Sequence, residues 1–139
     1  MIVVDTNVIS ELIRPAPAAP VMTWLQNQRA DDLWTTAITK AELLLGVALK
    51  PNGRKKAELA EAIEAILSTM FAGRILAFDS EAALHFPAVV MGRRKFQLNT
   101  DEADGQIAAI AKRHGIPVAT RNSRHFVHSG AEIINPWNE

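Results

Sequence analysis

The sequence contains no cysteine among its 139 residues. Disulfide bonds, zinc–thiolate sites and thiol catalysis are therefore excluded. Apolar runs are also short: stretches such as 41–49 and 107–111 fall well below the roughly 20 residues that a membrane-spanning helix needs. No basic start precedes an apolar segment at the N-terminus, so no secretory signal is expected. These absences predict a cytoplasmic protein with no membrane partner.

The chain also lacks an excess of charge of either sign, because 15 basic residues balance 15 acidic ones. No overall field attracts polyanions, and any contact with nucleic acid must come from a local patch. Three clusters of basic residues are candidates for such a patch, although each also fits a solvated helix face or loop. The candidates are Arg54–Lys56, Arg93–Lys95, and the set Arg113, Arg121 and Arg124. With 48% hydrophobic residues, the length predicts a single domain over 1–139.

Several well-known catalytic motifs are absent, among them G-x-S-x-G, G-x-x-x-x-G-K-[ST], G-x-G-x-x-G and H-E-x-x-H. His125 and His128 stand three apart in a Ser/Gly-flanked segment, which is typical of an exposed loop, and we assign them no ligand role. The tryptophans Trp24, Trp34 and Trp137 lie in apolar contexts. We interpret them as core or interface residues rather than as base-stacking platforms.

Short β-branched runs alternate with segments of helical periodicity along the chain. Strands are predicted over 2–4, 32–38, 74–78, 117–120 and 131–135. Helices are predicted from residue 8 to the break at Pro15, and over 21–29, 40–49, 55–71, 80–95 with an interruption near Pro87, and 100–114. Strands separated by helices need crossover connections. The expected fold is therefore α/β, with a mainly parallel sheet of about five strands and helices on both faces.

Four carboxylates stand near junctions between predicted strands and helices. Asp5 directly follows the first strand, and Glu42 lies at the start of the helix after the second. Asp101 and Asp104 occupy the first turns of the helix before the fourth strand. Since ligands of open parallel sheets bind at the carboxyl ends of the strands, these side chains are expected on one rim.

Each carboxylate also has a purely structural interpretation, because acids near helix N-termini cap free amides. Asp5 alone fits an N-cap, Asp101 and Asp104 fit a cap and its partner, and Thr39 with Glu42 fits a capping box. The combination favours another interpretation. Carboxylates that converge in a cleft repel one another unless a cation neutralises them. Mg²⁺ suits such a site and can drive phosphodiester hydrolysis.

Five segments resemble, in order, PIN-domain proteins of the VapC and FitB type. They are Ile2–Glu11, Thr39–Gly46, Asp104–Ala111, Ala119–Asn122 and Ile134–Trp137, which together span nearly the whole chain. The resemblance implies a PIN-like fold and a ribonuclease with Mg²⁺ or Mn²⁺ that acts as the toxin of a type II toxin–antitoxin pair. It further implies an RNA substrate, a small antitoxin partner and a homodimer.

The same resemblance implies roles for individual residues. Asp5, Glu42 and Asp104 match the family's acidic positions, and Thr6 and Asn7 match its supporting polar positions. Relatives often carry an acid after the T-R-N segment, where this chain has His125. A histidine adds no negative charge, so a second metal is expected to bind weakly, and Asn122 or Asp101 are the candidates to compensate.

We expect Asp5 and Asp104 to hold the ion, and Glu42 to act through water or to orient the attacking water. Arg121 and Arg124 are candidates to position the RNA backbone. An alternative is a catalytically weak PIN-domain module that binds an antitoxin and assists DNA binding. A phosphatase resembling the haloacid dehalogenase group is disfavoured, because that group needs D-x-D and Asn7 occupies the second acidic position.

Overall fold

The computed structural model describes residues 1–138. One five-stranded sheet runs through it in the order β3-β2-β1-β4-β5, and every neighbouring pair is parallel. The strands are β1 (Ile2–Val4), β2 (Leu33–Thr36), β3 (Ile75–Leu76), β4 (Val118–Ala119) and β5 (Ile133–Ile134). The predicted α/β class and parallel sheet are confirmed. The strands after β1 are shorter than predicted, because only their central residues pair before the chain turns away.

The helices follow the predicted order along the chain. They are α1 (Thr6–Ile13), α2 (Ala19–Gln26), α3 (Ala37–Ala48), α4 (Arg54–Ala65), α5 (Ser80–Ala83), α6 (Phe86–Arg94), α7 (Glu102–His114) and α8 (Ser123–Phe126). Helix α4 continues into a π-helical turn over Ile66–Met70. The break predicted near Pro87 lies just before α6, where the proline occupies the first turn and its missing N–H is not needed.

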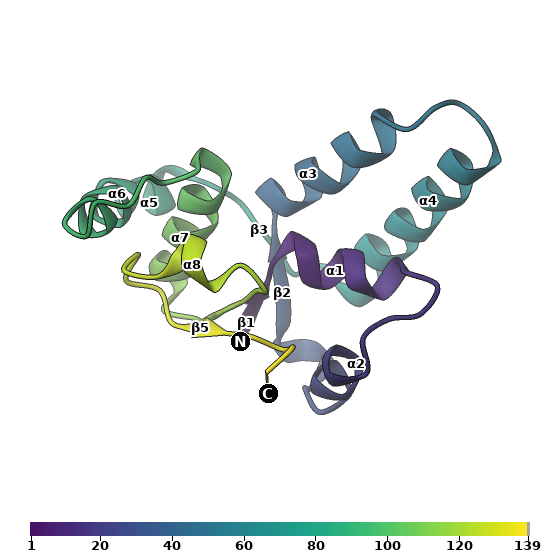
Figure 1. Ribbon diagram of the computed structural model, residues 1–139, viewed down its shortest axis with the longest axis horizontal. Coiled ribbons are helices and arrows are strands. Elements are labelled where there is room, and N and C mark those ends of the chain that lie inside the picture. Colours follow the sequence, from purple (N-terminus) through teal and green to yellow (C-terminus); the bar gives the residue numbers. More distant parts are fainter. Residues whose placement is uncertain (139) are drawn as a thin grey trace.

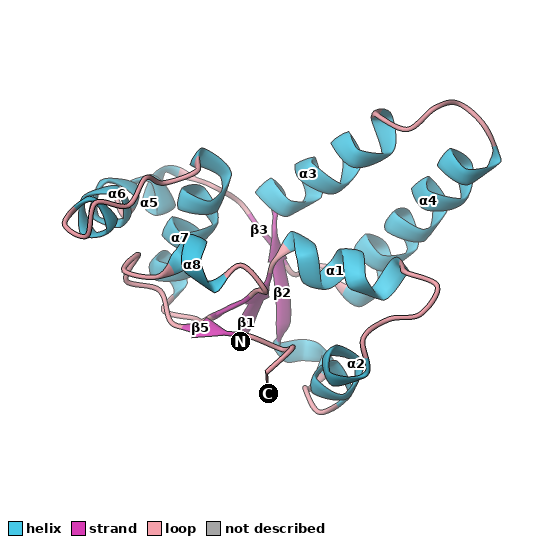
Figure 2. Ribbon diagram, in the orientation of Figure 1, coloured by secondary structure: helices cyan, strands magenta, loops and turns pink. Residues whose placement is uncertain are grey.

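The helices divide between the two faces of the sheet, with α1 to α4 on one side and α5 to α8 on the other (Figures 1 and 2). Neighbouring residues of β1 pack into hydrophobic clusters on opposite faces of the sheet, because side chains alternate along a strand. Val4 packs in the cluster that contains Leu25 and Phe71, whereas Val3 packs in the cluster that contains Ile107 and Phe126. β1 is therefore covered on both sides.

The chain changes direction across the sheet after β3. Strands β1, β2 and β3 follow one another toward one edge of the sheet and are connected through α1 to α4. The chain then returns through α5 to α7, and β4 pairs with the other side of β1. The crevice between β1 and β4 is thus the switch point of the sheet, where ligands of open parallel sheets bind. Asp5 and Thr120 directly follow these two strands.

Two local predictions are wrong. Helix α3 begins at Ala37, three residues earlier than predicted, because the Thr36 side chain caps it by accepting the Thr39 N–H at 3.0 Å. Residues 123–126 form the short helix α8 rather than an exposed loop, and this places His125 against the site. None of the helices in residues 1–138 combines the length and apolar character that crossing a membrane requires.

Candidate active site

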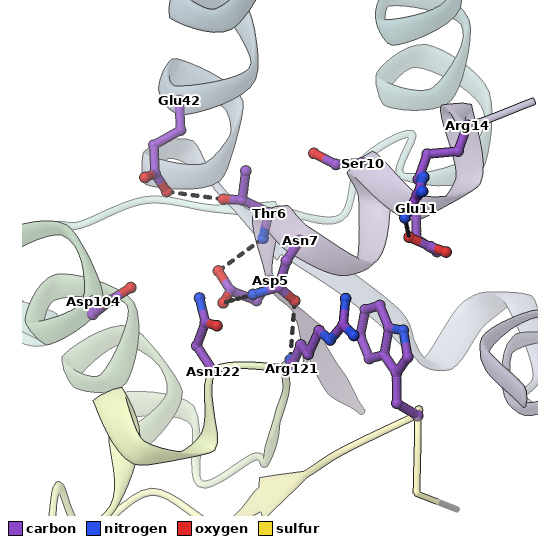
Figure 3. A pocket seen from close by; sticks show the side chains of 11 residues that line it. Asp5, Thr6, Asn7, Ser10, Glu11, Arg14, Glu42, Asp104, Arg121 and Asn122 are labelled. Carbon is purple, nitrogen blue, oxygen red and sulfur yellow. Dashed lines mark hydrogen bonds and ion pairs between the residues drawn. The ribbon is translucent and has the colours of Figure 1, made fainter. Parts of the chain in front are cut away.

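A cavity of about 490 Å³ opens at the carboxyl ends of β1 and β4 (Figure 3). We call it the acidic pocket. Its lining comes from α1, α3, α7 and the segments that follow β4 and β5. The lining residues are Asp5, Thr6, Asn7, Ser10, Glu11, Arg14, Glu42, Asp104, Arg121, Asn122 and Trp137. Asp5, Glu42 and Asp104, which are far apart in the sequence, thus lie around one cavity.

Asp5 lies at the bottom of the pocket and is 3% exposed. Its Oδ1 accepts the Thr6 N–H at 2.7 Å, so Asp5 does cap α1. Its Oδ2 accepts the Thr120 hydroxyl at 2.8 Å and the Asn7 amide at 3.2 Å. Burial raises the pKa of Asp5, these hydrogen bonds lower it, and the charge of Asp104 raises it further. The carboxylate is fixed in position yet disfavoured as an isolated charge.

Glu42 faces the pocket from α3 and does not form the capping box considered from the sequence. Its Oε1 accepts the hydroxyl of Thr6 at 2.8 Å (Figure 3). Because Thr36 already holds the Thr39 N–H, Glu42 is free of the helix terminus. Partial burial raises the pKa of Glu42, and the neighbouring carboxylates of Asp5 and Asp104 raise it as well.

Asp104 projects into the pocket from the first turn of α7, where Asp101 caps the helix through the Asp104 N–H at 3.3 Å. The Asp104 Oδ2 lies 3.0 Å from His125 Nδ1. Partial burial raises the pKa of Asp104, and the contact with His125 opposes that rise. His125 therefore occupies the outer side of this carboxylate, a contact that the sequence did not indicate.

The supporting residues divide into two groups. Thr6, Asn7 and Asn122 line the pocket, whereas Asp101 is not among the lining residues and serves as the cap of α7. Sequence reasoning missed Thr120, which is fully buried. Its hydroxyl bonds Asp5 and also accepts the Asn122 N–H at 3.0 Å. Its place directly after β4 was the available signal, since the same rule identified Asp5 after β1.

The remaining part of the pocket carries two arginines. Arg14 lies 3.3 Å from Glu11, whose other oxygen accepts the Ala18 N–H at 2.9 Å. That backbone hydrogen bond is the main reason why the pKa of Glu11 is lowered. Arg121 packs on the ring of Trp137. Trp137 contacts the core, as interpreted from the sequence, and it also lines the pocket. Of the two arginines considered from the sequence, Arg121 lines the cavity and Arg124 does not.

The donors of the acidic pocket fit a hard divalent cation. Among residues 1–138, no three Asp, Glu or His side chains are gathered closely enough to hold one ion together. Mg²⁺ does not need such a cage, because it is usually bound by one or two carboxylates and keeps several waters. Asp5 and Asp104 repel each other and both have raised pKa values. A cation held by both would offset that repulsion, and Glu42 lines the same cavity.

The parallel sheet and the acidic pocket at its switch point define the class of the protein. A family model for the PIN domain matches residues 2–130, and the chain belongs to the PIN-domain family. The fold and the resemblance expected from the sequence are thereby confirmed.

Particular relatives extend over the whole chain. The chain is 43% identical to the toxin FitB of Neisseria gonorrhoeae over 139 residues, which is 100% of both proteins. It is 39% identical to a VapC ribonuclease of Sinorhizobium fredii over 137 residues, covering 99% of this chain and 98% of the relative. A solved structure of FitAB bound to a DNA fragment matches with a TM-score of 0.92 at 43% identity, covering 99% of this chain and 96% of that one.

Proposed function

We propose that this protein is a metal-dependent endoribonuclease that acts as the toxin of a type II toxin–antitoxin pair. In this proposal, Asp5 and Asp104 hold Mg²⁺ or Mn²⁺, and Glu42 acts through water. The observation that carries the proposal is the meeting of these three carboxylates around one cavity, each with a raised pKa. The names of the relatives, toxin FitB and a VapC ribonuclease, support it.

The chain's own residues supply positioning and charge. Thr120 and Asn7 hold Asp5 so that its orientation is fixed before a ligand arrives. Glu42 is the most exposed of the three carboxylates and orients the attacking water beside the scissile phosphate. When bound, the divalent ion would act as a Lewis acid on the phosphodiester and stabilise negative charge on the leaving oxygen. Hydrolysis in this scheme needs no nucleophilic side chain.

The decisive experiment is cleavage of total cellular RNA by antitoxin-free protein in Mg²⁺, Mn²⁺ or EDTA. Asp5→Asn and Asp104→Asn are expected to abolish metal-dependent cleavage. Asp101→Asn is the matched control, because it removes a carboxylate three residues from Asp104 while asparagine still caps a helix. Full cleavage by Asp5→Asn, or an equal loss in all three variants, would contradict the assignment.

The proposal includes a small antitoxin and a homodimer. The similarity to FitAB over nearly the whole chain supports the antitoxin. Such a partner is expected to lay apolar anchors in a groove and to place a basic side chain at the acidic pocket. Co-purification with the product of a neighbouring small open reading frame tests the first part. Sedimentation of the isolated chain at micromolar concentration tests the second, and a monomer would count against it.

A second candidate function is a catalytically weak module that binds the antitoxin and assists DNA binding. His125 favours it, because a histidine beside Asp104 replaces a negative charge of the site by a neutral or positive group. The relative FitAB is described bound to DNA. This function predicts no cleavage in any metal but a tighter antitoxin–DNA complex when the chain is present, measured by gel shift. Cleavage lost in Asp5→Asn would reject it.

A further inference from the structure

Trp137 and Arg121 meet at the wall of the acidic pocket. The guanidinium carbon of Arg121 lies 5.0 Å from the centre of the Trp137 ring, which is the geometry of a cation–π contact. Both residues line the same cavity as Asp5. Planar aromatic and guanidinium groups are the surfaces on which proteins stack unpaired nucleobases. The pair therefore has the chemistry of a base-binding platform.

The pair is anchored to Asp5 through one side chain. The Arg121 N–H donates to Asn7 Oδ1 at 3.0 Å, and the Asn7 amide donates to Asp5 Oδ2 at 3.2 Å (Figure 3). On the other side, the Trp137 N–H donates to Asn135 Oδ1 at 3.0 Å, and the indole packs against the core. The backbone at Arg121 is thereby tied to Asp5, and the indole is held against the core, without the help of a ligand.

Both groups remain available for a ligand. Arg121 is exposed and forms no salt bridge within residues 1–138, in contrast to Arg14, which is paired with Glu11. Its guanidinium N–H groups can thus turn to phosphate or base oxygens. Trp137 is only partly buried, whereas Trp24 is 8% exposed and serves the core. Trp137 thus presents part of its surface to the cavity that Asp5 also lines.

We propose that Trp137 and Arg121 form a stacking subsite for one unpaired nucleobase of an RNA strand, next to the scissile phosphate. The inference rests on the proposed ribonuclease function and adds a substrate-positioning element to it. A base inside a duplex is already stacked on its neighbours, so the subsite selects strands whose bases can be splayed out. The protein is accordingly expected to prefer single-stranded RNA and to hold the base beside Asp5.

The first test measures binding of a fluorescently labelled, unstructured RNA oligonucleotide by anisotropy in EDTA, where cleavage is suppressed. Trp137→Leu, which keeps apolar volume but removes the ring, is expected to weaken binding on the order of tenfold, the loss of one stacked base. Trp137→Phe keeps most of the affinity. Arg121→Lys weakens binding because ammonium is not planar. Arg29→Lys, at an exposed arginine between α2 and β2 that does not line the acidic pocket, is the matched control and leaves affinity unchanged.

A second readout reports on Trp137 directly and does not depend on a drastic variant. The chain has three tryptophans, and the emission lost in Trp137→Phe isolates the contribution of this one. RNA is expected to quench that part of the emission in the wild-type protein. Unchanged emission, together with unchanged affinity in a folded Trp137→Leu protein, would overturn the subsite. Loss of antitoxin binding with RNA affinity intact would overturn it too, and would assign the pair to the protein partner.

Cleavage kinetics separate failure of the subsite from failure of the nuclease. In Mg²⁺, Trp137→Leu should raise KM on the order of tenfold with little change in kcat, because the ring does not touch the reacting atoms. Cleavage with an unchanged KM would reject the subsite and leave the nuclease intact. RNA binding that depends on Trp137, with no cleavage in any metal, would support the subsite and reject the nuclease.

Discussion

Replacing Thr120 by valine tests whether the network around Asp5 stabilises the fold. Valine keeps the shape of threonine but removes the hydroxyl, which donates to Asp5 at 2.8 Å and accepts from Asn122 and Asn7 at 3.0 and 3.2 Å. A hydrogen bond to a charged group contributes about 1.5–3 kcal/mol, and a neutral one about 0.5–1.5 kcal/mol. The expected loss in the free energy of unfolding at pH 7 is therefore about 3 kcal/mol.

Chain length converts this loss into a temperature. At about 2.1 cal/mol/K per residue, the 139 residues have an unfolding entropy near 0.3 kcal/mol/K, so that Tm falls by about 10 °C. Urea denaturation and calorimetry in EDTA measure both quantities. The loss in the free energy of unfolding should shrink as the pH falls through the pKa of Asp5, because a neutral carboxyl group forms a weaker hydrogen bond with the hydroxyl than the carboxylate does.

Thr35→Val provides the matched control. Thr35 is also fully buried at the end of a strand and donates at 2.8 Å, but to the backbone carbonyl of Val4 rather than to a carboxylate. It should lose only about 1 kcal/mol. If Thr120→Val is no more destabilised than Thr35→Val, or if its loss is independent of pH, the reasoning that the network serves a buried charge is refuted.

Three other variants test the site and its support. Asp104→Asn should be more stable than wild type at pH 7 in EDTA. Burial raises the pKa of Asp104 in the folded protein above 3.8. The stabilisation from its protonated carboxyl group is therefore complete below pH 3.8 and is lost as the pH rises through the pKa of the folded state. Saturating Mg²⁺ at about 100 times Kd should raise the wild-type Tm by about 9 °C and leave this variant unchanged. Gly105→Ala should lower the free energy of unfolding, measured by denaturation, by about 1–2 kcal/mol, since the added Cβ would lie 2.7 Å from Phe86 and Thr100 side-chain atoms. An unchanged free energy would mean that these side chains move aside at no cost. Arg93→Lys should lower the free energy of unfolding by about 2–4 kcal/mol and increase amide exchange in α8, because one ammonium cannot replace a buried guanidinium that bonds three carbonyls. Unchanged amide exchange would show that Arg93 does not hold α8 in place.

The pattern of the sequence predicted the fold class and the three pocket carboxylates for identifiable reasons. Periodicity distinguished strands from helices, and the rule for open parallel sheets pointed to the carboxyl ends of the strands. Asp5 was predictable in both of its roles, because a residue that follows β1 at the switch point caps α1 and faces the pocket at once. The bounds of strands and helices were less predictable.

One error came from competition between two similar residues, and two misses came from tertiary contacts. Thr36 and Thr39 both suit an N-cap, and only the length of β2 decides in favour of Thr36, which frees Glu42 from the helix terminus. The contact between His125 and Asp104 was not predictable, because it requires the short helix α8 to be held by the buried Arg93. The position of Trp137 beside Arg121 likewise depends on how the segment after β5 returns to the sheet.

The hydrogen bond between Thr120 and Asp5 joins residues that are 115 positions apart. During synthesis at roughly 5–20 residues per second, Asp5 is added to the chain roughly 6–23 seconds before Thr120. Helices α1 to α4 can already fold onto β1 and β2 in that interval, while the acidic pocket still lacks Asp104 and its β4 wall. The part of the chain that forms β1, β2 and α1 to α4 is therefore complete before Asp104 and Thr120 exist, and the acidic pocket is among the last parts of the fold that the growing chain can assemble.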